Sequence, residues 1–251
     1  MRSEASHRAE FNDFTETSYR ALLRSAKRSY RFARFTESPS DRHVLWRHDL
    51  DISMNRAYRL AQIEHDEGVS ATYFVFPRSL YYNILNSSTH KLVQNIIALG
   101  HDLALHFDPT HYSSDISGTE LLDAIAKERE LLQREFGARP VALSFHLYGV
   151  LPKPMPEDDE ICGMVNAYGR TLKANYDYVS DSNGVWLYRR LADVLEAAEH
   201  PHLQVLTHPE WWTPEVMPPR KRLQRAIDGY AEAMGRWYDE TVAESGRPNL
   251  S

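Results

Sequence analysis

The chain has 251 residues, 42% of them hydrophobic and 25% charged, and its 29 basic and 35 acidic side chains give a net charge of −6. This composition is typical of a folded globular protein, and it lacks the basic excess of a protein whose main partner is nucleic acid. The single cysteine, Cys162, excludes an internal disulfide framework and fits a reducing compartment. We therefore expect no nucleic-acid partner.

The N-terminal residues, MRSEASHRAEFNDFTETSYR, lack the apolar stretch of a secretion signal, and no later segment has the length and apolar character of a membrane span. We therefore expect no transmembrane segment and a cytoplasmic location. The chain contains 12 histidines, a high number for its length. Their clustering is thus the compositional clue to function.

An amphipathic helix is predicted over residues 14–33. Its apolar side chains recur at helical spacing, and they are Tyr19, Leu22, Leu23, Ala26 and Tyr30. We assign residues 1–40 to an N-terminal helical extension packed on the rest of the protein. Residues 41–251 then form one domain.

Short apolar segments alternate with helical patterns in the remainder of the chain. The predicted strands are 43–51, 71–76, 102–107, 141–145, 176–181 and 203–208. The predicted helices are 53–67, 89–99, 117–136, 158–173, 191–199 and 219–243. This alternation predicts a parallel sheet, either doubly wound or closed into a barrel. The final helix either packs against the core or forms a dimer face; we favour core packing and leave the oligomeric state open.

Aspartate or histidine side chains stand at the carboxyl ends of five predicted strands. They are Asp49 and Asp51, His106, His146, Asp181 and His208. In parallel α/β folds, ligands bind at this edge because the loops converge there. A single residue of this kind is commonly a helix cap or a structural side chain. Five such strand ends on one edge predict a functional site.

Two carboxylates share one face of the first of these strands. In LWRHDLDIS, Arg47, Asp49 and Asp51 alternate along the strand and so point the same way. Two neighbouring carboxylates repel each other, and a bound cation removes this cost. Carboxylate and imidazole are good ligands for zinc and related ions. One aspartate would then bind the metal, the other would act as general base on a water, and a histidine would protonate the leaving group.

Five motifs in this order, RHDLD, GHDLALHFD, SFH, YVSDSNGVW and LQVLTHPEWW, resemble those of the polysaccharide deacetylase family. They cover about residues 43–212, and they are most similar to the bacterial branch linked to surface-sugar biosynthesis. The resemblance implies an α/β fold, a distorted (β/α)7-type barrel in a single domain. It also implies a metal-dependent hydrolase of carbon–nitrogen bonds that removes acyl groups, usually acetyl, from amino sugars.

The resemblance also implies individual roles. Asp49 matches the catalytic base of the family and His208 its general acid. Asp51 and His106 match two of the ligands of a divalent metal, which we expect to be Zn²⁺.

The third metal ligand is where this chain departs from the family. The second metal histidine of the family stands four residues after the first, where this chain has Thr110. One candidate is His111, one residue further on. The other is His146, in SFHLYG, at the place of the family's usual arginine. We favour His146, which would complete a three-residue site with an open position.

Five residues are candidates for substrate contacts: Arg47, Asp181, Asn183, Glu210 and Trp211. Asp181 and Asn183 suit sugar hydroxyls or the orientation of a catalytic side chain, but Asn183-Gly184 is also a strong turn signal. Trp211 would stack on a sugar or pack the barrel mouth. Arg47 and Glu210 would orient the base and the acid.

For a cytoplasmic enzyme we expect a small-molecule amino-sugar substrate, a nucleotide- or lipid-linked precursor of O-antigen or capsule that carries an acetyl or formyl group. Two alternatives remain open. One is a hydrolase of another linear amide. The other is a metal- or sugar-binding protein of the same fold without turnover.

Overall fold

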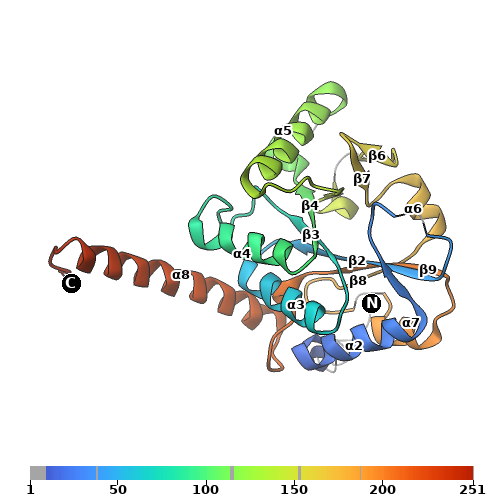
Figure 1. The fold of residues 1–251 in the computed structure, drawn as a ribbon, viewed down its shortest axis with the longest axis horizontal. Helices are drawn as coiled ribbons and strands as arrows, with labels where there is room; N and C mark the ends of the chain where they lie inside the picture. The colour runs from blue at the N-terminus through green and yellow to red at the C-terminus, as the bar shows by residue number, and fades with distance from the viewer. Residues whose placement is uncertain (1–9, 38, 114–115, 152–153, 187, 251) are drawn as a thin grey trace.

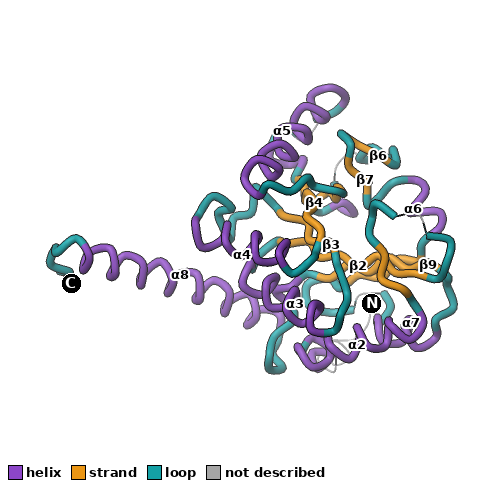
Figure 2. Tube along the Cα trace, in the orientation of Figure 1, coloured by secondary structure: helices purple, strands orange, loops and turns teal. Residues whose placement is uncertain are grey.

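A curled sheet of nine strands forms the centre of the computed structural model, and helices surround it (Figures 1 and 2). The structure describes residues 10–37, 39–113, 116–151, 154–186 and 188–250. Residues 1–9 of the predicted N-terminal extension therefore lie outside the described residues. Within the described part, η1 (Glu10–Phe14) and α2 (Glu16–Ser29) precede the first strand, and α2 packs against α3 and α7.

The sheet is parallel apart from one short hairpin. Its strands are β1 (Arg31–Ala33), β2 (His43–Leu50), β3 (Thr72–Val75), β4 (Asp102–Phe107), β5 (Ala142–Phe145), β6 (Glu160–Ile161), β7 (Met164–Asn166), β8 (Asp177–Ser180) and β9 (His202–Thr207). Their order is β6-β7-β5-β4-β3-β2-β9-β8, with β1 beside β2, and only β6 and β7 pair antiparallel. The predicted single α/β domain with a distorted barrel is thus confirmed.

The remaining helices mostly follow the predicted pattern. They are α3 (Met54–Asp66), α4 (Ser87–Ala98), α5 (Gly118–Phe136), α6 (Arg170–Asn175), α7 (Leu191–Ala197) and α8 (Pro219–Glu244), with 3-10 turns η2 (Pro109–His111), η3 (Tyr148–Val150) and η4 (Pro209–Trp211). Gly137 ends α5 with φ 66°, a conformation that other residues rarely adopt. Among the described helices, none combines the length and the apolar character that crossing a membrane requires.

Two predicted helices differ from the structure. The helix predicted over 14–33 ends at Ser29, and residues 31–33 form β1 alongside β2. The helix predicted over 158–173 is wrong, because residues 160–166 form the β6–β7 hairpin and only 170–175 are helical. Ile161 and Met164 have helical spacing, but Cys162 and Gly163 both have positive φ, which makes a tight hairpin turn between them.

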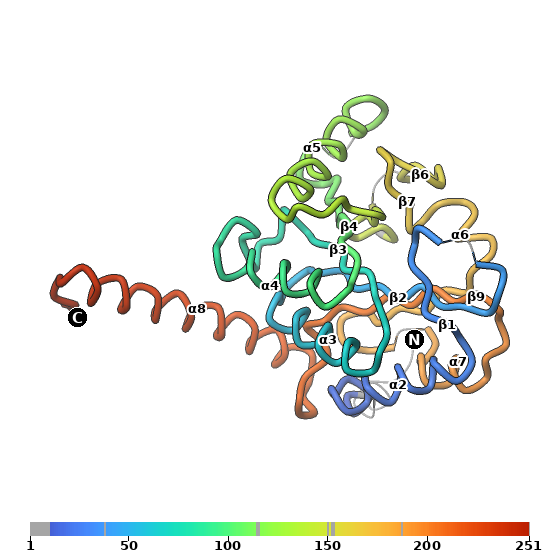
Figure 3. The backbone as a smooth tube through the Cα atoms, in the orientation of Figure 1, coloured from blue at the N-terminus to red at the C-terminus, as the bar shows by residue number. Residues whose placement is uncertain are grey.

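The expected packing of the final helix against the core is also wrong. In α8, Arg222 is the buried residue, and residues 227–241 are all exposed. The helix leaves the body of the protein soon after it begins (Figure 3). Its large apolar side chains Ile227, Tyr230, Met234 and Trp237 are 38–62% exposed.

Strand β2, which carries Asp49, is buried along its whole length. A polar network holds its far face. His48 lies 2.6 Å from Glu64 of α3, and Glu64 also accepts hydrogen bonds from Tyr19 and, at 2.6 Å, from Tyr73. His101 lies 3.5 Å from the same carboxylate. Both histidines therefore make structural contacts. His48 lies on the face of β2 opposite to that of Asp49.

Because Glu64 is fully buried among these partners, we expect Glu64→Ala to lower the free energy of unfolding by about 3–5 kcal/mol. The histidine and tyrosine groups would lose a shared acceptor while staying buried. Urea denaturation measures the change. Glu130→Ala, at an exposed position of α5, is the control and should change stability by less than about 0.5 kcal/mol. Equal stability of both variants would contradict the role of the network.

Candidate metal and catalytic site

The carboxyl ends of β2, β4, β5, β8 and β9 meet at a cavity of about 510 Å³. All six polar residues that the sequence places at strand ends line it: Asp49, Asp51, His106, His146, Asp181 and His208. Parallel strands bring these positions to one edge although they are spread over 160 residues of sequence. The structure thus gathers the charged groups in one place.

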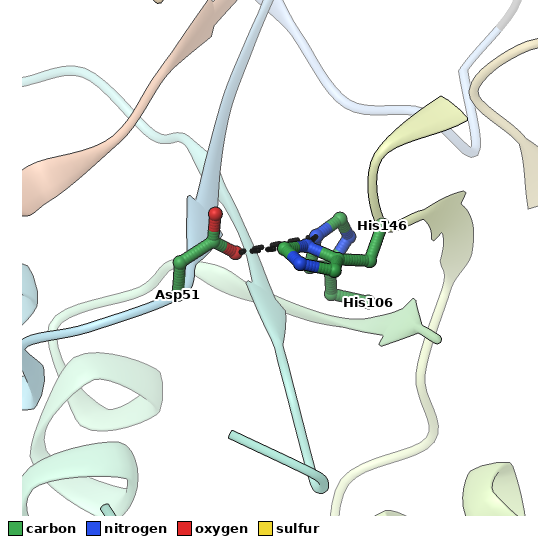
Figure 4. A group of neighbouring side chains, drawn as sticks. All are labelled: Asp51, His106 and His146. Atoms are coloured by element: carbon green, nitrogen blue, oxygen red, sulfur yellow. Dashed lines mark hydrogen bonds and ion pairs between the residues drawn. The ribbon is translucent and has the colours of Figure 1, made fainter. Parts of the chain in front are cut away.

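Asp51, His106 and His146 point toward one another (Figure 4). Asp51 Oδ1 lies 3.3 Å from His106 Nε2 and 3.7 Å from His146 Nδ1, and the two nitrogens are 3.1 Å apart. Asp51 Oδ1 is buried, and it has no hydrogen-bond partner among the described residues. Ser53 caps the N-terminus of α3, because its hydroxyl accepts from Arg56 N. Asp51 therefore does not cap this helix.

These three groups fit a divalent cation. One carboxylate and two imidazoles that converge beside an open cavity are the usual protein ligands of a catalytic zinc. Burial raises the pKa of Asp51, but the neighbouring His106 and His208 lower it by more than burial raises it. The pKa of Asp51 therefore lies well below its ordinary value. Burial and the proximity of His106 lower the pKa of His146, which favours the neutral imidazole that binds metals.

The alternative ligand, His111, lies elsewhere. It is exposed at the end of η2, and its ring packs against Tyr112 with centroids 5.3 Å apart. Among the described residues, the group that could hold a metal contains His146 and excludes His111.

Asp49 lies next to this group and is held from two sides. Arg47 donates to Asp49 Oδ2 at 3.4 Å, and the Ser144 hydroxyl donates to Oδ1 at 3.3 Å. With its proton directed to Asp49, Ser144 Oγ can accept from His106 Nδ1, 2.6 Å away. This arrangement leaves the lone pair on His106 Nε2, the nitrogen that faces Asp51.

His208 is held by Asp181. Its Nδ1 lies 2.5 Å from Asp181 Oδ1, its backbone N–H donates to the same carboxylate, and Trp212 Nε1 donates to Asp181 Oδ2 at 3.3 Å. The other ring nitrogen, Nε2, lies 3.9 Å from Asp51 Oδ2. Burial lowers the pKa of His208, but Asp181 and Asp51 raise it more, and the result is well above the ordinary value. This direction favours the protonated imidazole, the form that a general acid requires.

Four of the five predicted substrate contacts do not line this cavity: Arg47, Asn183, Glu210 and Trp211. Arg47 is fully buried and reaches the cavity through two lining residues, Asp49 and Tyr168, to both of which it donates. Trp211 packs in the core. Asn183 has φ 51° in a tight turn, which agrees with its turn signal. Glu210 is 2% exposed and borders a second cavity, beside α8.

Sequence reasoning missed two features of the site. One is Ser144, which strand alternation could have identified because it stands two residues before His146 and shares its face. The other is an aromatic wall from loops and from β8, made by Tyr148, Tyr168, Tyr178 and Tyr188, with Arg189 beside it. No spacing rule places loop residues at a cavity, so only the fold reveals this wall.

No protein-family model matches the chain, and no curated protein sequence matches it. Similar solved structures include a CE4 family pseudoenzyme from Bacillus anthracis (14% identity, 78% of this chain and 63% of that chain, TM-score 0.46). Also similar is a polysaccharide deacetylase from Bacillus cereus (18% identity, 76% of this chain and 88% of that chain, TM-score 0.45). A third is a family 4 acetyl xylan esterase from Clostridium thermocellum in complex with a cobalt ion (16% identity, 82% of this chain and 92% of that chain, TM-score 0.41). This chain thus spans less than two thirds of the pseudoenzyme. We base the function on the geometry of the site.

Proposed function

We propose that this protein is a metal-dependent hydrolase that removes an N-acyl group, acetyl or formyl, from an amino sugar. One observation carries the proposal. Asp49 and His208 line the same cavity as the group of Asp51, His106 and His146. A base, an acid and a metal-binding triad around one open space are the components that amide hydrolysis requires.

Asp51, His106 and His146 would hold the metal, for which we propose Zn²⁺ because one carboxylate and two imidazoles suit it. A bound divalent ion would supply Lewis acidity, which polarises the acyl carbonyl and makes water more acidic. Ser144 orients one of these ligands. Its hydroxyl contacts His106 Nδ1 and so holds the ring with Nε2 toward Asp51.

Asp49 is the base of the proposed reaction. Its carboxylate takes the proton of the attacking water as the oxygen–carbon bond forms. Arg47 and Ser144 keep the carboxylate in place through the contacts at 3.4 and 3.3 Å.

His208 is the acid. When the carbon–nitrogen bond breaks, the departing nitrogen takes the proton from Nε2 of His208 and leaves as an amine. Asp181 holds the opposite nitrogen, Nδ1, at 2.5 Å and stabilises the imidazolium before the transfer. This pairing orients Nε2 toward the cavity and keeps the proton available.

The aromatic wall supports a sugar as the substrate. Tyr178 and Tyr188 line the cavity and are 40% and 84% exposed, so each can offer a ring to the apolar face of a sugar. We further propose a nucleotide- or lipid-linked precursor in the cytoplasm, on the way to O-antigen or capsule. This finer assignment rests on the resemblance of the five sequence motifs to the surface-sugar branch.

A substrate panel tests the proposal. N-acetyl and N-formyl amino sugars, free and nucleotide-linked, are incubated with the Zn²⁺-loaded protein and with chelator-treated protein, and released acetate or formate is quantified. We expect release by the loaded protein only. If the loaded protein binds a sugar but releases no acid from any member of the panel, the protein is a binding protein.

We expect Asp181→Asn to move the alkaline limb of the kcat/KM–pH profile to lower pH and to reduce kcat by about 10²-fold. The groups that face His208 are Asp181, Asp51 and Glu210, and Asp181 raises its pKa most. Loss of that charge lowers the pKa of His208, so the protonated acid is lost at a lower pH. Asp193→Asn, at an exposed site on α7, is the control. An unchanged alkaline limb in Asp181→Asn would exclude His208 as the acid.

A further inference from the structure

Helix α8 projects away from the body of the protein (Figures 1 and 3). It has 26 residues, which corresponds to a length of about 39 Å. Residues 227–241 are all exposed, and they include Gly229 and Gly235, around which the space is open. Each glycine weakens a helix by about 1 kcal/mol relative to alanine. A helix of this kind is marginal in water unless another surface packs against it.

Four large apolar side chains form one stripe along α8. Ile227, Tyr230, Met234 and Trp237 alternate at spacings of three and four residues, and they are 38%, 44%, 44% and 62% exposed. This is the spacing by which two helices pack along a common seam. Small residues flank the stripe: Ala226, Gly229, Ala231 and Ala233. They allow the backbone of a second helix to come close.

The stripe forms one wall of a groove. Tyr230, Met234 and Trp237 line a cavity of about 620 Å³ whose other wall includes Tyr82 and Leu92 of the body. Leu80 and Leu85, in the loop before α4, are 97% and 59% exposed. Apolar surface thus continues from α8 onto the neighbouring loop.

The charges of α8 are divided between its ends. Its first seven residues contain four basic side chains and no acidic one: Arg220, Lys221, Arg222 and Arg225. The residues from 228 onward contain five acidic side chains, Asp228, Glu232, Asp239, Glu240 and Glu244, against the single basic Arg236. Arg222 and Arg225 also line the groove, together with Arg56. The basic end of the helix is therefore complementary to its own acidic end in an antiparallel copy.

We propose that the partner of this surface is a second copy of the chain, whose α8 packs antiparallel along the apolar stripe. The acidic end of each helix then enters the groove of the other copy, beside Arg225 and Arg56. Such an interface is two-fold symmetric, because the same patch serves both copies, and it closes after two chains. A parallel pair would instead place like charges side by side.

Sedimentation velocity of the full chain over a range of concentrations tests the dimer. We expect a species of about twice the 29.0 kDa chain mass. Met234→Glu with Trp237→Glu should raise the dimer Kd by at least about 100-fold, because two buried anchors are lost from each copy. The control is Leu122→Glu, at a leucine of α5 that is 44% exposed. A wild-type monomer at all concentrations, or a dimer that survives the double change, would overturn the proposal.

Spin labels at two positions test the orientation. In a Cys162→Ser background, Glu232→Cys lies near the middle of the stripe and Glu240→Cys near its end. In an antiparallel pair the distance between the labels of the two copies is short at position 232 and longer by about 20 Å or more at 240, since each residue advances the helix by 1.5 Å. Equal short distances at both positions would show a parallel pair and overturn the proposed geometry.

Discussion

Asp49→Asn reduces kcat by about 10²–10⁴-fold and leaves the metal content unchanged. Asparagine keeps the size of aspartate, and its one carbonyl oxygen can accept from Arg47 or from Ser144, but it cannot take a proton from water. Because Asp49 is separate from the group of Asp51, His106 and His146, its loss should not release the metal. Acid release and elemental analysis of the same preparation measure both quantities.

Asp158→Asn is the control for this change, since it makes the same substitution at a side chain that is 66% exposed. It should retain full activity. If Asp49→Asn loses its metal, then Asp49 is a ligand and the two aspartates have exchanged roles. If it keeps both metal and activity, Asp49 is not the base.

Asp51→Ala and His106→Ala lower the metal content from about one ion per chain to below about 0.1, and activity falls with it. Each variant removes one of the three groups, Asp51, His106 and His146, that converge at the proposed metal site. Two remaining ligands hold a divalent ion weakly. Elemental analysis after dialysis against metal-free buffer measures the loss.

A pair of histidine variants identifies the third ligand. His146→Ala should lose the metal as Asp51→Ala does, whereas His111→Ala should keep it, because His111 is exposed on η2 and lies outside the group. The opposite result, with metal lost only from His111→Ala, would mean that the loop containing η2 closes over the site and that His146 has another role.

Much of the site could be predicted because strand ends obey a simple rule. Side chains that follow the strands of a parallel sheet meet at one edge, so LWRHDLDIS, LHF, SFH and LTH lead to one cavity once the strands are found. Alternation along β2 also separates Asp49 from His48, which contacts Glu64 on the far face. These inferences depend on local periodicity alone.

Other parts depend on contacts that local patterns do not encode. The helical spacing of Ile161 and Met164 was overridden by a turn with two positive φ angles. The loop tyrosines reach the cavity through the path of loops, which sequence spacing does not set. The apolar stripe on α8 predicts that another surface packs against the helix. The same periodicity fits packing on the core of this chain and packing on another chain. The structure places the stripe outside the core.

Zinc titration of the chelator-treated protein, followed by acetate or formate release from the preferred amino-sugar substrate, tests the central claim most directly. The claim is that Asp51, His106 and His146 hold one ion for a reaction carried out by Asp49 and His208. We predict that activity rises linearly and stops rising at one equivalent of Zn²⁺ per chain. Full activity before any metal is added, or no released acid at any equivalence, would contradict it.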